Sequence, residues 1–291
     1  MIDNDRQILH ASANTLVFLP GLLLALAVLP LPAWAELKHE LELGVGVGMV
    51  NFPVYRGAED RRSYILPVPY FDYNGDKLQI NRDRLRSRLF RSDQVELDIS
   101  VSGSVPVNSS DTTTRKGMDD IDAILEVGPL LNLHLYYDER KQTNLDLRLP
   151  FRAVLPIRPY RIDHQGWIFQ PALNLDLRNV WQSGWNMGLQ TGLVFGDQAY
   201  NQYFYNVAPQ FATPERPAYS TTGGFGGSQF TTSLSRRRGG IWMGGFLRWD
   251  NLSGAVFEDS PLVTRKQSFS LGFAVSWILY SSEKMVEVSN D

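Results

Sequence analysis

Alternation of apolar and polar residues dominates the chain from residue 41 onward. In the first run the odd positions are Leu41, Leu43, Val45, Val47 and Met49, and the even positions between them are glutamate or glycine. A period of two places successive side chains on opposite faces of an extended strand. The same pattern returns at residues 95–102, 125–135, 145–151, 167–177, 185–195 and 269–279. The chain is therefore predicted to form long strands, each with one apolar and one polar face.

The length of these runs and the charges on their polar faces favour a membrane barrel. Most of them reach the roughly 9–11 residues that a tilted membrane strand needs. A closed barrel also satisfies every backbone amide in lipid, which an open sheet cannot do. We therefore predict an all-β fold, an antiparallel transmembrane β-barrel of the outer membrane. The alternative is a secreted β-sandwich, which would hide its apolar faces in a shared core.

The connections between the runs alternate in length, as they do in bacterial barrels with short periplasmic turns and long outer loops. Short turns are expected at residues 74–76, 91–93, 138–141, 182–184 and 238–240, and long loops at 51–61, 108–120, 157–164, 198–227 and 253–265. Strict alternation requires residues 77–90 to form a short hairpin that turns near Arg82 and Asp83, and the barrel then has twelve strands. If that segment is not a membrane hairpin, the count is ten.

The amino-terminal segment has the pattern of a cleaved export signal. Residues 16–29 are almost entirely apolar, and the triplet Ala33-Trp34-Ala35 follows before the polar residues begin. We expect residues 1–35 to be removed and residues 36–291 to form a single barrel domain. A membrane anchor is the alternative, but Pro20 and Gly21 interrupt the apolar stretch. The formal net charge of −3 gives no reason to expect nucleic-acid binding.

No combination of residues in the sequence indicates catalysis or a cofactor. The predicted mature chain has three histidines, His39, His134 and His164, and none lies beside a distinctive nucleophile motif. The histidine spacings of metal sites are absent. Asp119, Asp120 and Asp122 could ligate calcium, but such a site needs about 6–8 oxygens, and a solvated acidic turn is the simpler interpretation. We therefore expect a protein without enzymatic activity, cofactor or metal.

Two clusters of arginine are unusual. Arg82, Arg84, Arg86 and Arg88 share one face of an extended strand, and charge on the lipid face is costly, so we expect this face to line the lumen or a rim. The favoured interpretation is a salt-bridged barrel interior. The alternatives are an anion-selecting wall or a rim that contacts lipopolysaccharide phosphates. A second cluster, residues 236–238, lies near a short turn and is expected to face the periplasm.

The longest predicted loop, residues 198–227, combines aromatic residues with proline and a run of glycines. Long loops of this kind are usually functional or disordered. The segment could fold inward as a constriction, extend outward as an adhesive surface, or continue two strands beyond the membrane. The residues do not choose among these alternatives.

Several motifs resemble a known family, that of the MltA-interacting protein and the outer-membrane protein OmpV. The resemblance covers essentially the whole predicted mature chain and rests on Tyr-Arg-Gly at residues 55–57, Pro-Val-Pro-Tyr at 67–70, Tyr-Phe-Tyr-Asn-Val at 203–207, Leu-Ser-Gly at 252–254 and Ser-Pro-Leu-Val at 260–263. The last block is the most specific. The motif positions that we follow into the structure are Tyr55, Gly57, Pro67, Tyr205, Ser260, Pro261 and Leu262.

The resemblance implies an outer-membrane barrel and two different roles. One role is a scaffold that brings a lytic murein transglycosylase together with a penicillin-binding murein synthase. The other is a porin-like channel or surface adhesin. Because the family shares a fold rather than a site, carrying over either role is analogy. We expect a non-enzymatic scaffold in contact with outer-membrane lipid and lipopolysaccharide, with a small-solute pore as the alternative and a lipid hydrolase as a weaker one.

Overall fold

The structure is a computed structural model. It describes residues 36–288 except residues 76–77, 81–84, 88–89, 93, 139–140, 159–160 and 181. The predicted signal peptide, residues 1–35, lies outside the described residues. The part that is described belongs to one compact unit, Ala35–Asp291.

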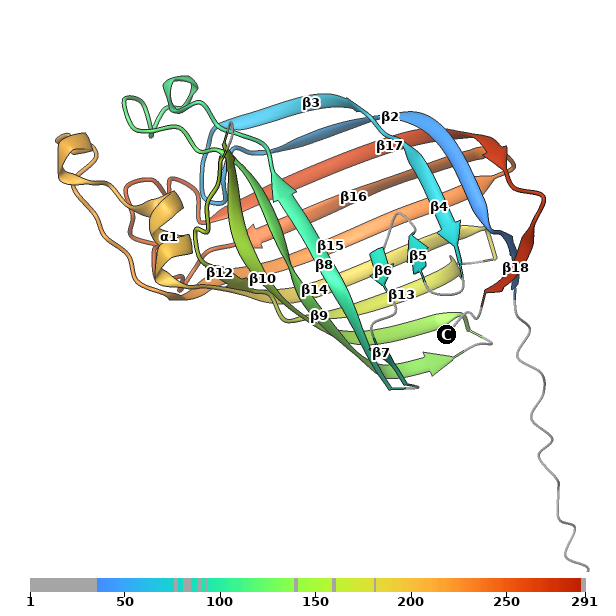
Figure 1. Cartoon of the computed structure of the whole chain (residues 1–291). Coiled ribbons are helices and arrows are strands. Elements are labelled where there is room, and N and C mark those ends of the chain that lie inside the picture. The colour runs from blue at the N-terminus through green and yellow to red at the C-terminus, as the bar shows by residue number, and fades with distance from the viewer. Residues whose placement is uncertain are drawn as a thin grey trace, which may run out of the picture. The chain divides into compact units, whose positions relative to one another are not determined.

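Nearly all the regular structure in this unit is antiparallel strand (Figure 1). The strands are β1 (Glu36–His39), β2 (Leu41–Pro53), β3 (Arg61–Pro67), β4 (Tyr70–Asn74), β5 (Leu78–Ile80), β6 (Leu85–Ser87), β7 (Phe90–Arg91), β8 (Val95–Ser104), β9 (Ala123–Asp138), β10 (Thr143–Arg158), β11 (Arg161–Ile162), β12 (Trp167–Phe169), β13 (Ala172–Val180), β14 (Trp185–Gly196), β15 (Gly224–Arg238), β16 (Ile241–Asn251), β17 (Gln267–Ser281) and β18 (Met285–Val288). The helices are α1 (Gln198–Tyr205) and the short 3₁₀ segments Ser109–Asp111 and Pro209–Phe211.

Sixteen of these segments form one sheet that makes a twelve-stranded barrel, as the alternation predicts. Three of the twelve strands are interrupted: β3 continues as β4, β6 as β7, and β11 as β12 and β13. The last long strand, β17, pairs with the first, β2, and β6 and β7 stand at the two ends of the ladder order, with only two residues between them in the chain. Strand β6, at one end of this order, also lies against β8 near the other end, so the sheet closes into a barrel. The short hairpin expected within residues 77–90 is present as β5 and β6.

The two faces of the wall have the polarity of a membrane barrel. Apolar residues at odd positions of β2 and β17 point outward, with Val45 and Phe273 each 56% exposed. The charged residues Glu96, Asp146 and Asp250 are almost fully buried inside. A water-soluble protein would place these groups the other way round, and an apolar outer band around a polar interior is what lipid requires. No helix among the described residues is long and apolar enough to span a membrane.

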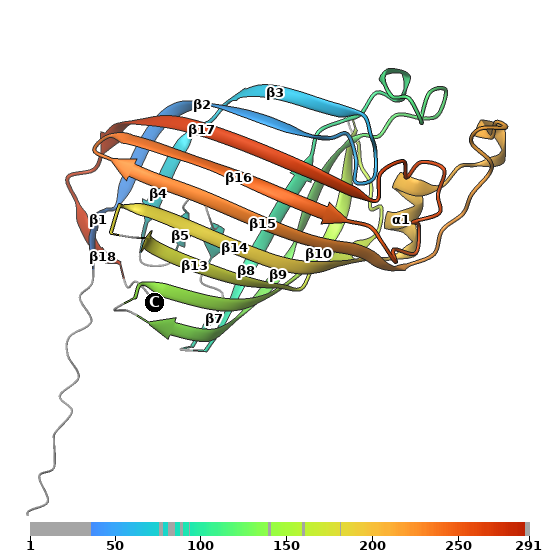
Figure 2. The same cartoon turned by 180° about the vertical axis from the view of Figure 1, so that it is seen from behind.

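The two ends of the barrel differ (Figures 1 and 2). One end, the turn end, has short connections, and there β1 pairs with β18 in a separate two-stranded ribbon. The other end, the loop end, has the long connections and carries α1. Helix α1 was not predicted, because no helical period is evident in the sequence of the long loop 198–227. It begins because the Asp197 side chain accepts a hydrogen bond from the Tyr200 backbone amide at 2.8 Å, which is a standard helix N-cap.

Candidate functional site

The turn end of the barrel contains a polar mouth. A cavity of about 620 Å³ lies there, and its lining includes His39, Glu42, Asp72, Arg178 and Arg237. These side chains come from β1, β2, β4, β13 and β15, so well-separated strands contribute to one rim. Both signs of charge are present together with hydrogen-bonding groups. A surface of this composition can bind a polar ligand or a protein segment.

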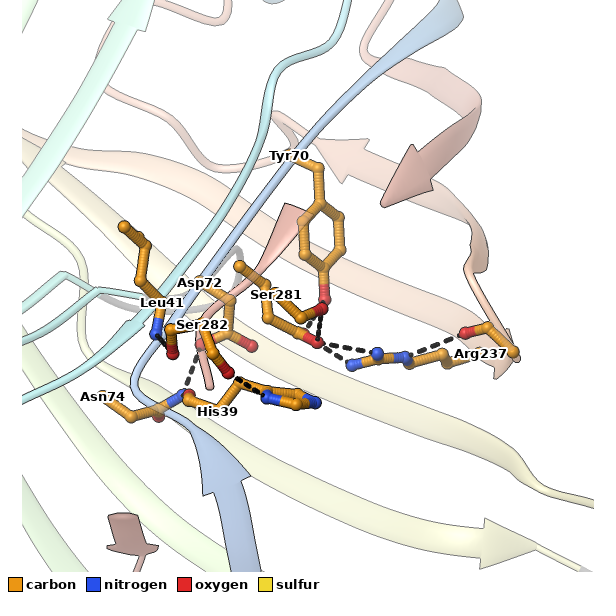
Figure 3. Close-up of polar contacts among 10 residues, drawn as sticks. His39, Leu41, Tyr70, Asp72, Asn74, Arg237, Ser281 and Ser282 are labelled. Carbon is orange, nitrogen blue, oxygen red and sulfur yellow. Dashed lines mark hydrogen bonds and ion pairs between the residues drawn. The ribbon is translucent and has the colours of Figure 1, made fainter. Parts of the chain in front are cut away.

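An ion pair between β15 and β2 connects two sides of this mouth (Figure 3). Arg237 donates through both terminal nitrogens to the carboxylate of Glu42, at 2.6 and 2.8 Å. The Ser281 hydroxyl donates to the same carboxylate at 3.0 Å, and the Tyr70 hydroxyl reaches it at 3.5 Å. Glu42 is only 3% exposed. A buried carboxylate needs such partners, and a two-pronged arginine contact fixes its geometry.

The ribbon of β1 and β18 is fastened to the barrel by a second set of contacts. His39 Nδ1 donates to the Ser282 carbonyl at 2.6 Å, and Asn74 Nδ2 donates to the His39 carbonyl at 3.2 Å. Lys284 pairs with Glu40 at 2.7 Å. These contacts join the start of β2 to the exit from β17. They give the turn end a defined extension beyond the short turns.

The barrel interior beside β8, β9, β10 and β13 carries a chain of ion pairs. His134 Nδ1 lies 2.7 Å from Asp146, and its Nε2 lies 3.7 Å from Glu96. Arg148 lies 3.9 Å from Asp146 and 3.6 Å from Asp176. His134 lies on the polar face of β9, and the alternation of apolar and polar residues predicts that this face lines the lumen. The pairs keep buried charges compensated, as the low dielectric of an interior requires.

Two further clusters lie nearer the loop end. Arg152 pairs with Glu126 at 3.0 Å. The carboxylate of Asp250 is fully buried, and it forms ion pairs with Arg56 at 3.0 Å and with Arg248 at 2.9 Å. The sequence signals these residues only as charges on polar faces. It gives no indication that Arg56, which lies in a long loop, reaches a carboxylate on β16.

The loop end is closed by a packed cap that contains most of the family motif positions. The Tyr55 hydroxyl donates to the Leu262 carbonyl at 2.8 Å, and the Ser260 hydroxyl donates to the Tyr205 carbonyl at 2.7 Å. Gly57 accepts at its carbonyl from the backbone amides of residues 264 and 265, at 2.9 and 3.0 Å. The motifs therefore lie far apart in the sequence but close together in the cap. We infer that they build this cap.

The cap has a hydrophobic core of its own. Leu262 is fully buried and Phe257 is 1% exposed, and the Tyr205 ring stacks on Phe257 with centroids 3.6 Å apart. Burial raises the pKa of the Tyr205 and Tyr55 hydroxyls above their ordinary range, because the charged form would lose its solvation. Burial also lowers the pKa of Arg115, which donates to the Phe204 carbonyl at 3.1 Å. The cap is a folded unit rather than a set of loose loops.

The other predicted site residues fall in three places. Arg82, Arg84 and Arg88 lie outside the described residues, and Arg86 is described only through its backbone, which pairs with Gln79 between β5 and β6. The proposed role of these four side chains therefore stays a prediction. Pro67 ends β3, and Pro261 lies in the cap turn before Leu262. Of the second cluster, Arg237 reaches Glu42, and Arg236 lies over the Trp185 ring at 5.7 Å.

The histidines and the acidic loop residues have structural partners. His39 and His134 bind the carbonyl and carboxylates given above, and His164 packs edge-on against Trp167 with centroids 5.1 Å apart. Asp120 accepts from the Ser109 amide at 2.6 Å, and Asp122 pairs with Arg158 at 2.8 Å. Within the described part of the chain, no three side chains of metal-binding type lie close enough together to hold an ion.

The apolar outer band, the charged interior and the two unlike ends define the class: the protein is a β-barrel of the outer membrane. Comparison with known proteins also identifies its family. The chain belongs to the family described as MltA-interacting protein MipA, which matches residues 45–279. In barrels of this class the short turns face the periplasm, so the turn end is the periplasmic end.

Solved structures with a similar chain path are distant. The NanC porin in a rhombohedral crystal form is 10% identical, with a TM-score of 0.34, and the match covers 82% of this chain and all of that one. A bacterial polysaccharide outer membrane secretin is 7% identical, with a TM-score of 0.38 and coverage of 83% and 99%. The Ralstonia pickettii toluene transporter TbuX is 10% identical, with a TM-score of 0.22 and coverage of 87% and 73%. No curated protein matches the chain.

Proposed function

We propose that the protein is a non-enzymatic scaffold that docks a murein-remodelling enzyme at its periplasmic end. The family name supports an MltA-type lytic transglycosylase as the first partner, and the resemblance adds a penicillin-binding murein synthase as the second. The observation that carries the proposal is the construction of the turn end. It combines a charged mouth with a ribbon that extends beyond the turns.

The ribbon addresses a difficulty of the scaffold role. Short periplasmic turns offer little contact area, whereas a stable protein interface typically buries about 1,200–2,000 Å² in total. The ribbon adds two strands to this face, and its pairing is local to β1 and β18. A two-stranded ribbon has backbone groups at both outer edges, which a partner can use for strand addition. The scaffold therefore has a surface in the compartment where murein enzymes work.

Capture of a purified lytic transglycosylase by the purified protein in detergent tests the proposal. Lys284→Glu breaks the pair with Glu40 and should lower retention, and the double variant Glu40→Lys/Lys284→Glu should restore it by re-forming the pair with reversed charges. Glu215→Lys, exposed on the cap, is the matched control and should retain the enzyme like the unmodified protein. Equal retention by the Lys284→Glu variant, or no retention by any form, would contradict the docking role.

A small-solute channel is the second candidate, and the polar interior favours it. Arg148 and Asp176 line the interior with side chains 20% and 35% exposed, so charged groups reach a wettable space. The packed cap closes the outer end of that space. We therefore expect low single-channel conductance that rises when residues 206–222 of the cap are deleted. A deletion that folds and leaves the conductance unchanged would remove the channel role.

A further inference from the structure

The polar mouth at the turn end has the size and enclosure of a site for a small ligand. Its volume of about 620 Å³ lies within the range of about 300–1,000 Å³ that is typical of small-molecule pockets. The ribbon lines it on one side, and β4, β13 and β14 of the wall line it elsewhere. In the ladder β2, β17, β16, β15 and β14 separate β4 from β13. A ligand in this cavity would therefore be held between distant parts of the rim.

Asp72 presents a carboxylate with unused acceptor capacity to this cavity. It stands opposite Glu42 in the ladder between β4 and β2, and both residues line the mouth. Arg237 compensates the charge of Glu42, as described above. Within the described part of the chain, the one side-chain hydrogen bond that Asp72 accepts comes from the Asn74 amide at 3.0 Å. A carboxylate has about four acceptor positions, so Asp72 can accept further bonds from a ligand.

Two asparagines of β13 and β14 supply donors to the same cavity. Asn179 Oδ1 accepts from the Gly184 backbone amide at 2.8 Å, and Asn186 Oδ1 accepts from the Asn179 backbone amide at 3.0 Å. These bonds fix the planes of both side-chain amides. Among the residues that the structure describes, they leave the amino group of each side chain available, and both side chains line the mouth. The mouth therefore holds oriented donors on one part of the rim and a carboxylate acceptor on another.

The ribbon adds apolar surface to this polar cavity. Leu37 and Met285 line it and are 60% and 44% exposed. Met285 pairs with His39, two residues after Leu37, so the three side chains lie on one face of the ribbon. This face is turned toward the mouth, since all three residues line the cavity. A ligand there would meet apolar side chains on one side and hydrogen-bonding groups on the others.

This combination matches a carbohydrate better than an ion or a charged peptide. A sugar ring has apolar C–H faces, and its hydroxyl groups both donate and accept at its edge. The positive charges of Lys38 and Arg237 already act on Asp72, so this carboxylate needs a neutral donor rather than another cation. An acetamido substituent would add a carbonyl for the asparagine amino groups and a methyl group for the apolar face of the ribbon.

We propose that the periplasmic mouth binds an N-acetylated disaccharide unit of a glycan strand, which is the chemistry of the murein backbone. The sugar hydroxyls donate to Asp72, and the acetamido carbonyl accepts from Asn179 or Asn186. The acetamido methyl group packs against Leu37 and Met285. The assignment to murein rests on the docking role proposed above, because that role brings a murein enzyme to the same end of the barrel.

Saturation-transfer NMR with N,N′-diacetylchitobiose tests the site. The purified protein is kept in lauryldimethylamine oxide, a detergent whose head group contains no sugar. We expect saturable binding with the strongest saturation at the acetamido methyl protons, and binding of cellobiose at least about tenfold weaker, which corresponds to about 1.4 kcal/mol. Absence of saturable binding, equal binding of cellobiose, or displacement of the sugar by a zwitterionic tetrapeptide at equal concentration would overturn the proposal.

Matched variants locate the contacts. Asp72→Asn removes the charged acceptor and should weaken binding about tenfold, whereas Asp259→Asn, exposed on the cap, should not. Asn186→Asp keeps the oxygen that holds the Asn179 amide but removes the amino group, and it should also weaken binding about tenfold. Its control is Asn108→Asp, exposed at the loop end.

A third pair of variants tests the ribbon. Leu37→Ser should lower the saturation of the acetamido methyl protons, and Val286→Ser, on the other face of the ribbon, should not. The heat-dependent shift of the barrel on gels identifies folded variants, and Asn186→Asp carries the test if Asp72→Asn does not fold. Unchanged affinity in a folded Asn186→Asp variant would overturn the site.

The measurement contains no transglycosylase, so this inference and the docking role fail separately. A protein that retains the enzyme but binds no sugar contradicts the glycan site alone. A protein that binds the sugar but retains no enzyme contradicts the docking role and leaves the glycan site supported.

Discussion

Arg237 of β15 donates two hydrogen bonds to Glu42 of β2, at 2.6 and 2.8 Å, although 195 residues separate them in the chain. Strands β16 and β17 lie between β15 and β2 in the ladder, so the pair spans two strands of the periplasmic rim. It ties the first strand of the barrel to one of the last. The rim geometry therefore depends on a contact that forms only when the two ends of the sheet meet.

Arg237→Ala should destabilise the barrel by about 1–2 kcal/mol, because it leaves the Glu42 carboxylate buried without its main partner, while water reaching the half-exposed arginine position limits the loss. Urea unfolding of the protein in lipid, followed by tryptophan fluorescence, measures the change. Arg238→Ala, at the same strand end, is the control and should stay within about 0.5 kcal/mol of the unmodified protein. Equal shifts in the two variants would show that the ion pair contributes nothing.

Gly57→Ala should loosen the cap. Gly57 has φ of +95°, and a Cβ there would lie 2.8 Å from Leu252 Cδ1, so both backbone strain and a clash with a buried side chain arise. We expect a loss of about 2–3 kcal/mol in cap stability. Gly117→Ala is the comparison, since φ is +82° but no atom lies within 4 Å of the added Cβ. The rate of trypsin cleavage within the cap measures the effect of each substitution. We expect the Gly57→Ala variant to be cleaved faster than the Gly117→Ala variant.

Substitutions of Tyr205 should separate its hydroxyl from its ring. Tyr205→Phe removes the hydrogen bond to the Arg56 carbonyl, which is 3.0 Å long, and should cost about 1 kcal/mol. Tyr205→Ala also removes the ring stacked on Phe257 and should cost about 3–5 kcal/mol. Proteolysis at Arg216, with the barrel monitored by its slower-migrating unfolded form on gels, distinguishes cap opening from barrel unfolding. A barrel that unfolds together with the cap would contradict the independence of the cap core.

As the pH rises above about 10, the cap should open before the barrel unfolds. Burial raises the pKa of Tyr55 and Tyr205 above their unfolded value of about 10. Their contribution to cap stability is fully present below that unfolded pKa and is lost as pH rises toward the folded pKa, because only the opened cap can release the protons. Phenolate absorbance should show a late phase that coincides with the onset of tryptic cleavage in the cap. In Tyr55→Phe that phase should shrink by one tyrosine, and a single transition near pH 10 for all tyrosines would contradict the prediction.

The barrel could be predicted because its determinants are local. Alternation such as Val45, Val47 and Met49 sets the outward face of each strand from its own residues, and turn lengths set the order of neighbours. The twelve-strand count rests on the short hairpin of β5 and β6, which the alternation of turns requires. The odd and even positions of β9 and β10 also place His134 and Asp146 together on the lumen face, where the structure pairs them.

The cap and the rim could not be predicted in the same way. Tyr55 and Leu262 come into contact because closure of the barrel brings the first and last long loops together. No local sequence pattern indicates this contact. Arg237 was recognised as a turn-end charge and Glu42 as a polar-face residue, but their pairing depends on how far strands tilt across the wall. Helix α1 was missed because eight residues are too few to show a helical period among closely spaced aromatics.

The hydrogen bond between Tyr55 and the Leu262 carbonyl joins positions 207 residues apart. A cap built from the loops of both the first and the last strands has no partner surfaces until the final strand is in place. During insertion, every intermediate would present Tyr55, Tyr205 and Phe257 unburied at the cell surface side. Resistance of the cap to protease therefore reports that the last strand has been inserted and that the barrel is complete.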